Sequence, residues 1–181
     1  MGRRGPYAAG AASQVAPRWQ DGRRAAGRGQ RLIRYYDASA LVKRYVDEPG
    51  SQEVRSLMQL DSRHVTAAAS GAEVPAALAR AVRAGRLQMD EAQSALAHFR
   101  RDWERSYVVI PLNSVAARRA GELAWRHGLR GYDAVHLAAA LIAGEILGSP
   151  VEVVSYDREL ARAAQAEGLA VYPNGIETAA Y

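Results

Sequence analysis

The sequence predicts a three-layer α/β/α sandwich with a mainly parallel central sheet. From residue 32 onwards, short runs rich in β-branched and aromatic residues alternate with longer runs of helical periodicity. Such alternation is typical of parallel sheets that are covered by helices on both faces. Strong turn signals separate several of the runs, as at residues 48–50 (Glu-Pro-Gly) and 148–150 (Gly-Ser-Pro). With 181 residues, the chain is long enough for one domain with a sizeable core.

Each element expected in the first half has a local cause. The run 32–36 is β-prone and is followed by Asp37, and the helix after it stops at the turn signal of residues 48–50. Ser70 and Glu73 have the spacing of a capping box, which predicts a helix that Gly85 ends. In order, the expected elements are a strand over 32–36, helices over 38–46 and 51–60, a strand over 64–67, and helices over 70–84 and 88–103.

In the second half, residues 107–111 form the clearest strand, because three β-branched residues stand before a terminating proline. Asn113 is a suitable N-cap for a helix to about Trp125, with Gly128 just beyond it. The pattern is completed by a very apolar helix that follows residues 131–133 and runs to about Leu147, a strand over 151–154, a helix that follows Asp157 and runs to Glu167, and a last short strand over 169–172. The aromatic residues Phe99, Trp103 and Trp125 occupy helical positions and are expected in the core.

The net charge of +5 is distributed unevenly along the chain. Residues 1–34 contain eight arginines and one aspartate, a net charge of +7, whereas the other 147 residues contain 16 basic and 18 acidic side chains and carry −2. The high pI is therefore weak support for nucleic-acid binding by the folded part. Residues 1–31 are expected to form a disordered Arg/Gly-rich tail, either a solvated extension or a nonspecific RNA-tethering arm, and residues 32–181 to form a single domain.

Cysteine content and hydropathy limit the compartment and the kinds of site. There is no cysteine, which excludes disulfides and thiolate metal sites and favours the cytoplasm. No run reaches the roughly 20 apolar residues that span a bilayer. The most apolar stretch, residues 134–147, is too short and contains His136 and Glu145, so a buried helix is expected there.

Four carboxylates occupy comparable places in the predicted fold. Asp37 and Asp157 directly follow strands, Asp133 begins the most apolar helix, and Glu73 lies in the first turn of a helix that follows a strand. Because the carboxyl ends of parallel strands share one edge of the sheet, these side chains can converge. Clustered carboxylates raise one another's pKa, and a hard cation such as Mg²⁺ or Mn²⁺ supplies the compensating charge. Carboxylate-held Mg²⁺ is typical of phosphate chemistry.

Each acid also has a purely structural interpretation. An aspartate before a helix is a common N-cap, and Glu73 is half of the capping box expected with Ser70. His136 lies on the same helix as Asp133 and is expected to be a buried histidine with satisfied hydrogen bonds rather than a catalytic one. Spacing alone leaves the structural and the chemical interpretation of the acids open.

At these residues the chain resembles the PIN-domain nucleases, and among them the VapC-type toxins of bacterial toxin–antitoxin pairs. The matching stretches are Tyr36-Asp37-Ala38-Ser39-Ala40-Leu41-Val42-Lys43, Ser70-Gly71-Ala72-Glu73-Val74, Tyr132-Asp133-Ala134-Val135-His136-Leu137-Ala138 and Ser155-Tyr156-Asp157-Arg158-Glu159-Leu160. The resemblance covers about residues 32–175 and keeps all four acids in order. It departs from the family at Ser155, where threonine is frequent, and at Leu160, where an aromatic residue is common.

The resemblance implies a PIN-like fold and a Mg²⁺- or Mn²⁺-dependent endoribonuclease, usually a homodimer, that a small VapB-like antitoxin neutralises. It assigns catalysis and metal binding to four acids: Asp37, Glu73, Asp133 and Asp157. Glu73 would also orient the attacking water, and Ser39 and Ser155 would hydrogen-bond the ligand carboxylates or a phosphate oxygen. Lys43 and Arg44 could contact the substrate or the antitoxin, but a solvated helix face is expected for both.

Two other functions compete with the ribonuclease. A catalytically silent PIN domain would bind RNA or a protein without cutting, although the presence of all four acids argues against it. A haloacid-dehalogenase-like phosphatase would use Asp37 as a nucleophile, but that chemistry needs a second aspartate two residues later, where this chain has Ser39. RNA cleavage by the wild type beside Asp37→Asn would distinguish these functions.

Overall fold

A parallel sheet forms the centre of the molecule. The computed structural model describes residues 31–174, so the expectations for the N-terminal tail concern residues outside this range, Arg31 apart. Within the described residues the sheet has five strands in the order β3-β2-β1-β4-β5, and every adjacent pair is parallel. The strands are β1 (Ile33–Tyr36), β2 (Arg63–Ala67), β3 (Val108–Ile110), β4 (Val151–Val154) and β5 (Ala170–Tyr172).

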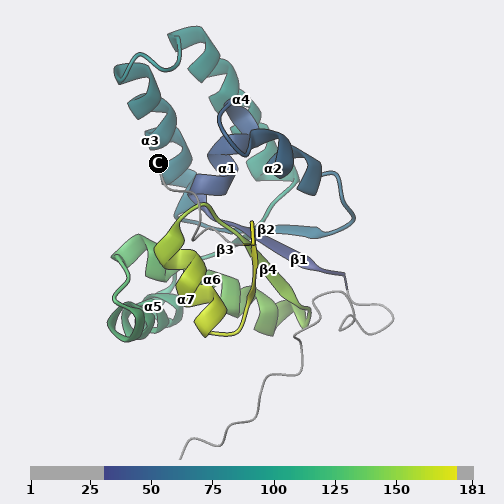
Figure 1. Ribbon diagram of the computed structural model, residues 1–181, viewed down its shortest axis with the longest axis vertical. Helices are drawn as coiled ribbons and strands as arrows, with labels where there is room; N and C mark the ends of the chain where they lie inside the picture. Colours follow the sequence, from purple (N-terminus) through teal and green to yellow (C-terminus); the bar gives the residue numbers. More distant parts are fainter. Residues whose placement is uncertain (1–30, 175–181) are drawn as a thin grey trace, which may run out of the picture.

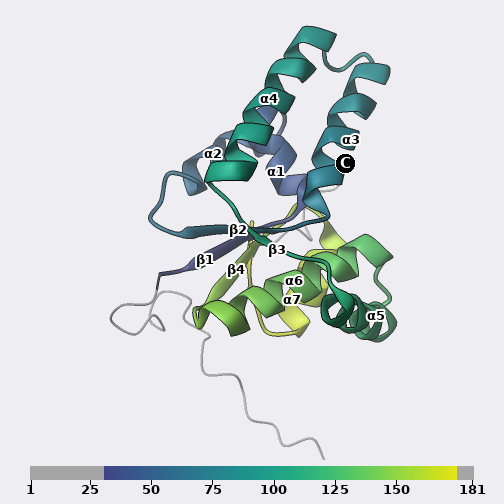
Figure 2. The same ribbon diagram turned by 180° about the vertical axis from the view of Figure 1, so that it is seen from behind.

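Helices cover both faces of the sheet (Figures 1 and 2). One face carries α1 (Ala38–Tyr45), α2 (Ser51–Leu57), α3 (Ser70–Arg83) and α4 (Met89–Arg105), and the other carries α5 (Ser114–His127), α6 (Gly131–Leu147) and α7 (Arg158–Ala166). In both views α3 and α4 run side by side and extend away from the sheet. The predicted three-layer sandwich with a parallel sheet is therefore confirmed, and most element ends lie within two residues of those expected.

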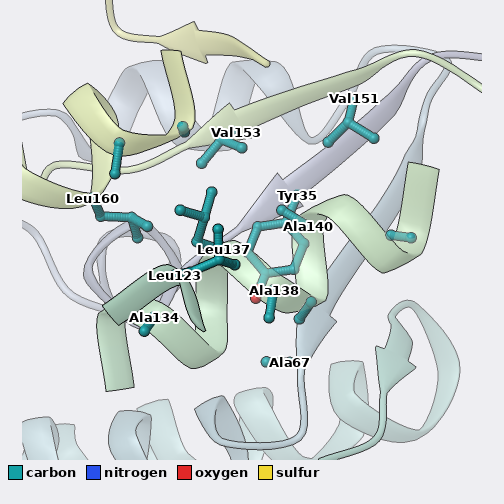
Figure 3. Packing of buried hydrophobic residues seen from close by; sticks show 14 of the residues in the cluster. Tyr35, Ala67, Leu123, Ala134, Leu137, Ala138, Ala140, Val151, Val153 and Leu160 are labelled. Carbon is teal, nitrogen blue, oxygen red and sulfur yellow. The ribbon is translucent and has the colours of Figure 1, made fainter. Parts of the chain in front are cut away.

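The central strand β1 is buried along its whole length because helices pack on both of its faces. Successive side chains of a strand point to opposite faces, so Ile33 and Tyr35 join the core cluster beneath α6, and Tyr36 joins the cluster beneath α1 and α3. Figure 3 shows Tyr35 packed beside Leu137 and the alanines of α6. These small side chains let α6 lie close to the sheet. No helix among the described residues is long and apolar enough to cross a membrane.

The expectation of a capping box between Ser70 and Glu73 is wrong. Helix α3 starts at Ser70 itself, its N-cap is Ala69, and no side chain caps it. The Ser70 hydroxyl is fully buried and lies 2.8 Å from the Thr66 hydroxyl, so strand β2 takes the oxygen that a cap would have used. A capping box is present at α4 instead, between Gln88 and Glu91.

Two further expectations about the helices differ from the structure. Phe99 is buried as predicted, but Trp125 is 92% exposed, because α5 turns its alanines and Leu123 towards the core. Helix α6 starts at Gly131, so Asp133 lies inside its first turn and not before it. The backbone N–H groups of a first turn are not used within the helix, so this position still favours a negative charge.

Candidate functional site

The strand order has its topological switch point at β1. The chain leaves β1 for β2 on one side, and it later returns as β4 on the other side. Ligand crevices in open parallel sheets form at the carboxyl ends of the two strands that flank such a switch. Tyr36 and Val154 are paired in register there, so the residues that follow them, Asp37 and Ser155, lie side by side.

Asp37 is the buried centre of this edge, with 4% of its surface exposed. Its carboxylate accepts hydrogen bonds from the Ala40 N–H (2.9 Å), the Ser39 hydroxyl (2.8 and 2.9 Å to its two oxygens) and the Ser155 hydroxyl (2.8 Å). Burial raises the pKa of Asp37, while His136 and these donors oppose the rise. Asp37 is thus the N-cap of α1, and it also presents a buried acid at the switch point.

The two serines connect Asp37 to the segment before α7. The Ser39 hydroxyl accepts a hydrogen bond from the Tyr156 N–H at 3.0 Å. The Ser155 hydroxyl accepts one from the Asp157 N–H at 3.1 Å. Each hydroxyl therefore bridges the Asp37 carboxylate and a backbone N–H of the 155–157 segment, which fixes the two sides of the crevice relative to each other.

Asp133 lies within electrostatic reach of both Asp37 and Asp157. Asp157 caps α7 and is partly buried. The pKa of Asp133 is raised first by burial, then by the charge of Asp157 and, to a smaller extent, by that of Asp37, with His136 and Arg130 acting in the opposite direction. The charges of Asp37 and Asp157 therefore both act on Asp133, although the three acids belong to α1, α7 and α6.

The fourth acid, Glu73, reaches the crevice from α3 and is held by a histidine. One of its oxygens lies 2.8 Å from His136 Nε2, and His136 Nδ1 lies 2.8 Å from the Tyr35 hydroxyl. The expectation that His136 is buried and fully hydrogen-bonded is confirmed. Sequence reasoning missed Tyr35, because a tyrosine inside a buried strand has no pattern that separates it from an ordinary core residue.

The donor set suits a hard divalent cation. None of the ion pairs between described residues involves Asp37, Asp133 or Asp157, so no lysine or arginine salt bridge among those residues neutralises them. Across residues 31–174, no three histidine, aspartate or glutamate side chains are arranged to hold a metal as they stand. Mg²⁺ needs only one or two carboxylates because it keeps several waters, so the carboxylate oxygens fit this ion without all four acids converging.

A pocket of about 590 Å³ opens beside these acids, between α1 and α3. Small side chains of the two helices form much of its wall, and the remaining lining is polar or aromatic. The lining residues are Ala38, Ser39, Val42, Lys43, Glu48, Ala72, Glu73, Ala76, Ala77, Arg80, Tyr132 and Tyr156. We call Asp37, Glu73, Asp133 and Asp157, with the two serines that bond Asp37, the acidic edge. Ser39 and Glu73 belong both to it and to the pocket lining, so the pocket gives a ligand access to the predicted site.

Lys43 and Arg44 are expected on a solvated helix face, and this expectation is wrong for Lys43. This side chain is buried, and its ammonium donates to Glu48 at 2.9 Å and to the Pro49 carbonyl at 2.7 Å. It also lies 4.3 Å from the centre of the Tyr156 ring. Arg44 is only partly exposed and pairs with a carboxylate of α4 at 2.7 Å. The lysine therefore braces the 48–50 turn against the segment before α7.

Comparisons with known proteins agree with this geometry. The family model for the PIN domain matches residues 34–166. Ribonuclease VapC45 and ribonuclease VapC49, from two strains of Mycobacterium tuberculosis, are each 38% identical over 146 residues, which span 79% of this chain and 96% of the relative. PAE2754 from Pyrobaculum aerophilum has a TM-score of 0.53 at 21% identity and covers 77% of this chain and 83% of its own. VapBC2 from Rickettsia felis, solved with a promoter DNA fragment, has a TM-score of 0.53 at 14% identity, with coverages of 77% and 96%. At these identities the two structures show likeness of fold alone.

Proposed function

This chain belongs to the PIN-domain family and is a VapC-type nuclease within it, and from this premise we propose that its acidic edge hydrolyses RNA phosphodiester bonds with Mg²⁺ or Mn²⁺ as cofactor. The environment of Asp37 is the observation that supports the proposal. Asp37 is a buried carboxylate at the switch point of the sheet, with no salt bridge to a described lysine or arginine, and its charge acts on Asp133 together with that of Asp157. Ionised carboxylates at such a site are unfavourable without a compensating positive charge, and a bound cation supplies it.

Each acid has a role in the proposed reaction. Asp37, Asp133 and Asp157 would hold the cation directly or through water, while Glu73 would complete the pocket and orient the attacking water. A cation held there would supply charge to orient the phosphodiester, lower the pKa of that water and stabilise the leaving oxygen. Ser39 and Ser155 keep the Asp37 carboxylate in place through the hydrogen bonds described above.

The pocket between α1 and α3 is the place proposed for the RNA strand. Arg80 lines it and supplies a positive charge for a phosphate, and Tyr132 lines it with an exposed ring next to Asp133 in the chain. Exposed aromatic rings commonly stack on the bases of single-stranded RNA. A single strand that passes Tyr132 would bring a backbone phosphate towards the acids.

The partners proposed for the protein follow from its VapC relatives and not from a contact in the structure. We assign it a second copy of itself, in a homodimer, and a small VapB-like antitoxin that suppresses cleavage. A cytoplasmic location belongs to the same proposal, because both the RNA substrate and a newly made antitoxin are found there. Co-expression with a small protein encoded next to it is expected to relieve growth arrest caused by the wild type.

Cleavage of a mixed RNA panel by the full-length protein tests the proposed activity. The wild type is expected to cut RNA with Mg²⁺ or Mn²⁺ and to stop in EDTA, and Asp37→Asn is expected to bind RNA without cutting it. Asp47→Asn is the matched control, since the Asp47 side chain is 88% exposed and, within residues 31–174, forms an ion pair with Arg55 alone. It is expected to cut as the wild type does.

Two results would contradict the proposal. Cleavage that survives EDTA would remove the cation from the reaction, and unchanged cleavage by a folded Asp37→Asn would remove the acidic edge from it. Binding of RNA without cleavage across the whole panel would instead support the silent PIN domain. The phosphatase alternative receives no support from the family match, which covers residues 34–166 with a nuclease family.

A further inference from the structure

Three side chains from three elements form a continuous hydrogen-bonded chain that ends at the acidic edge. It starts at the Tyr35 hydroxyl on β1, passes through both ring nitrogens of His136 on α6 and ends at Glu73 on α3, with 2.8 Å at each step. The first two side chains are almost completely buried, whereas 27% of the Glu73 side chain is exposed. The chain therefore runs from the buried core to a partly exposed acid of the candidate site.

If the His136 imidazole is neutral, the protons in this chain have one consistent arrangement. An ionised glutamate only accepts hydrogen bonds, so His136 Nε2 must carry a proton and donate it to Glu73. In the neutral imidazole the other nitrogen, Nδ1, is then an acceptor, and the Tyr35 hydroxyl donates to it. The backbone N–H of Ala67 also stabilises the Tyr35 oxygen, which leaves the phenolic proton free to point at the ring.

Packing against Tyr35 also restricts the orientation of the His136 ring. The Tyr35 and His136 rings meet edge to face, with centroids 6.0 Å apart and planes at 73°. Figure 3 shows Tyr35 packed against Leu137 and Ala140 of the same helix that carries His136. An imidazole held on one side by a buried phenol can offer its Nε2–H in only one direction, and that direction is towards Glu73.

We propose that His136 is a positioning residue for Glu73, and that Tyr35 sets the tautomer and the plane of its ring. The bond from Nε2 occupies one oxygen of the Glu73 carboxylate and leaves the other oxygen for the cation or its water. Hydrogen bonds to a carboxylate ligand restrict its rotation, and the loss of such a partner typically costs about 10–100-fold in metal affinity or activity. The inference rests on the proposed function, because it concerns the same acid.

The tautomer is tested without any activity measurement. Long-range ¹H–¹⁵N NMR spectra of the full-length protein distinguish a protonated ring nitrogen from a bare one. His136 is expected to carry its proton on Nε2 and to have a bare Nδ1, and Tyr35→Phe is expected to change this pattern. A wild-type spectrum with the proton on Nδ1 would overturn the inference and leave the proposed nuclease function untouched.

Mn²⁺ binding measured by calorimetry tests the positioning itself. His136→Leu, which has no donor, is expected to weaken Mn²⁺ binding about 10–100-fold, and Tyr35→Phe about 10-fold or less. His136→Gln can still donate an N–H to Glu73 and is expected to stay within about 3-fold of the wild type. Tyr107→Phe is the matched control, because it removes a phenol that bonds Tyr45 at 2.7 Å away from the acidic edge, and no change is expected.

The outcomes separate the inference from the proposed function. If the wild type binds Mn²⁺ and cuts RNA, and His136→Leu does both equally well while remaining folded, His136 has only a structural role and the inference fails alone. Equal losses in His136→Gln and His136→Leu would also overturn it, since the donor would then be irrelevant. A wild type that neither binds Mn²⁺ nor cuts RNA would overturn the proposed function and the positioning role together.

Discussion

Replacing Ser155 by alanine tests how the fold keeps a buried charge at the switch point. The Ser155 hydroxyl is fully buried, donates to the Asp37 carboxylate at 2.8 Å and accepts from the Asp157 N–H at 3.1 Å. Alanine removes both bonds and leaves the buried Asp37 carboxylate and the partly buried Asp157 N–H with one partner fewer each. The change is small in volume, so the effect comes from hydrogen bonding and not from a cavity.

The expected cost follows from these two bonds. A hydrogen bond to a charged group contributes about 1.5–3 kcal/mol, and one between neutral groups about 0.5–1.5 kcal/mol. Ser155→Ala is therefore expected to lower the free energy of unfolding by about 2–4 kcal/mol, a large share of the roughly 5–15 kcal/mol of a typical domain. Because the Ser155 bond lowers the pKa of Asp37, that pKa is also expected to rise further in the variant.

Urea unfolding in EDTA at pH 7 measures the cost, and a double-mutant cycle shows its origin. In an Asp37→Asn background the carboxylate is replaced by a neutral amide, so Ser155→Ala is expected to cost about 1 kcal/mol less than in the wild type. The control Ser56→Ala, at an exposed hydroxyl that bonds its own helix, is expected to stay within about 0.5 kcal/mol. A cost below about 1 kcal/mol, or equal costs in both backgrounds, would refute the reasoning.

Three further predictions concern stability. In EDTA at pH 7, Asp37→Asn is expected to melt at a higher temperature than the wild type, because burial raises the pKa of Asp37 and so disfavours its charged form in the folded state. Calorimetry should show this difference in melting temperature shrinking as the pH falls through the raised pKa towards 3.8. A lower melting temperature of the variant at every pH would contradict the prediction. Gly50→Ala is expected to lower the free energy of unfolding in urea by about 2–4 kcal/mol, since Gly50 has φ +91° and an added Cβ would lie 2.6 Å from the Tyr156 hydroxyl. Gly85→Ala, with φ +68° and nothing within 4 Å of the added Cβ, should cost only about 1–2 kcal/mol. Equal costs would show that the Tyr156 contact is unimportant. Trp125→Ala is expected to change the free energy of unfolding by less than about 0.5 kcal/mol, and a larger loss of stability would mean that Trp125 is covered in solution.

The layers of the fold could be predicted because their causes are local. Residues 33–36, 108–110 and 151–154 are short β-branched or aromatic runs next to turn residues, and each became a strand. Asp37 and Asp157 could be placed at the carboxyl edge by the same reasoning, since a parallel sheet puts all such ends together. Periodicity and turn signals carry this information without any knowledge of tertiary contacts.

The misses all depend on partners that periodicity does not reveal. Trp125 has a helical spacing compatible with the core, but the face of α5 that meets α6 carries smaller residues. Lys43 has a helical position compatible with solvent, but its partners Glu48 and Pro49 lie in a turn outside its own helix, and Tyr156 covers it from far along the chain. Glu73 and His136 are 63 positions apart, and the spacing of the acids says nothing about which way the glutamate turns. Side-chain orientation was therefore the part of the site that could not be predicted.

The pairing of β1 with β4 also sets the time at which the acidic edge can form during synthesis. Asp37 and Ser155, which face each other across that pair, are 118 positions apart. At about 5–20 residues per second, a ribosome needs roughly 6–24 s to get from one to the other. Towards the end of that interval the nascent chain contains Asp37, Glu73 and Asp133, but it still lacks the complete strand β4 and Ser155. The acidic edge is therefore assembled only when translation of the domain is almost finished, and shorter nascent chains do not contain it.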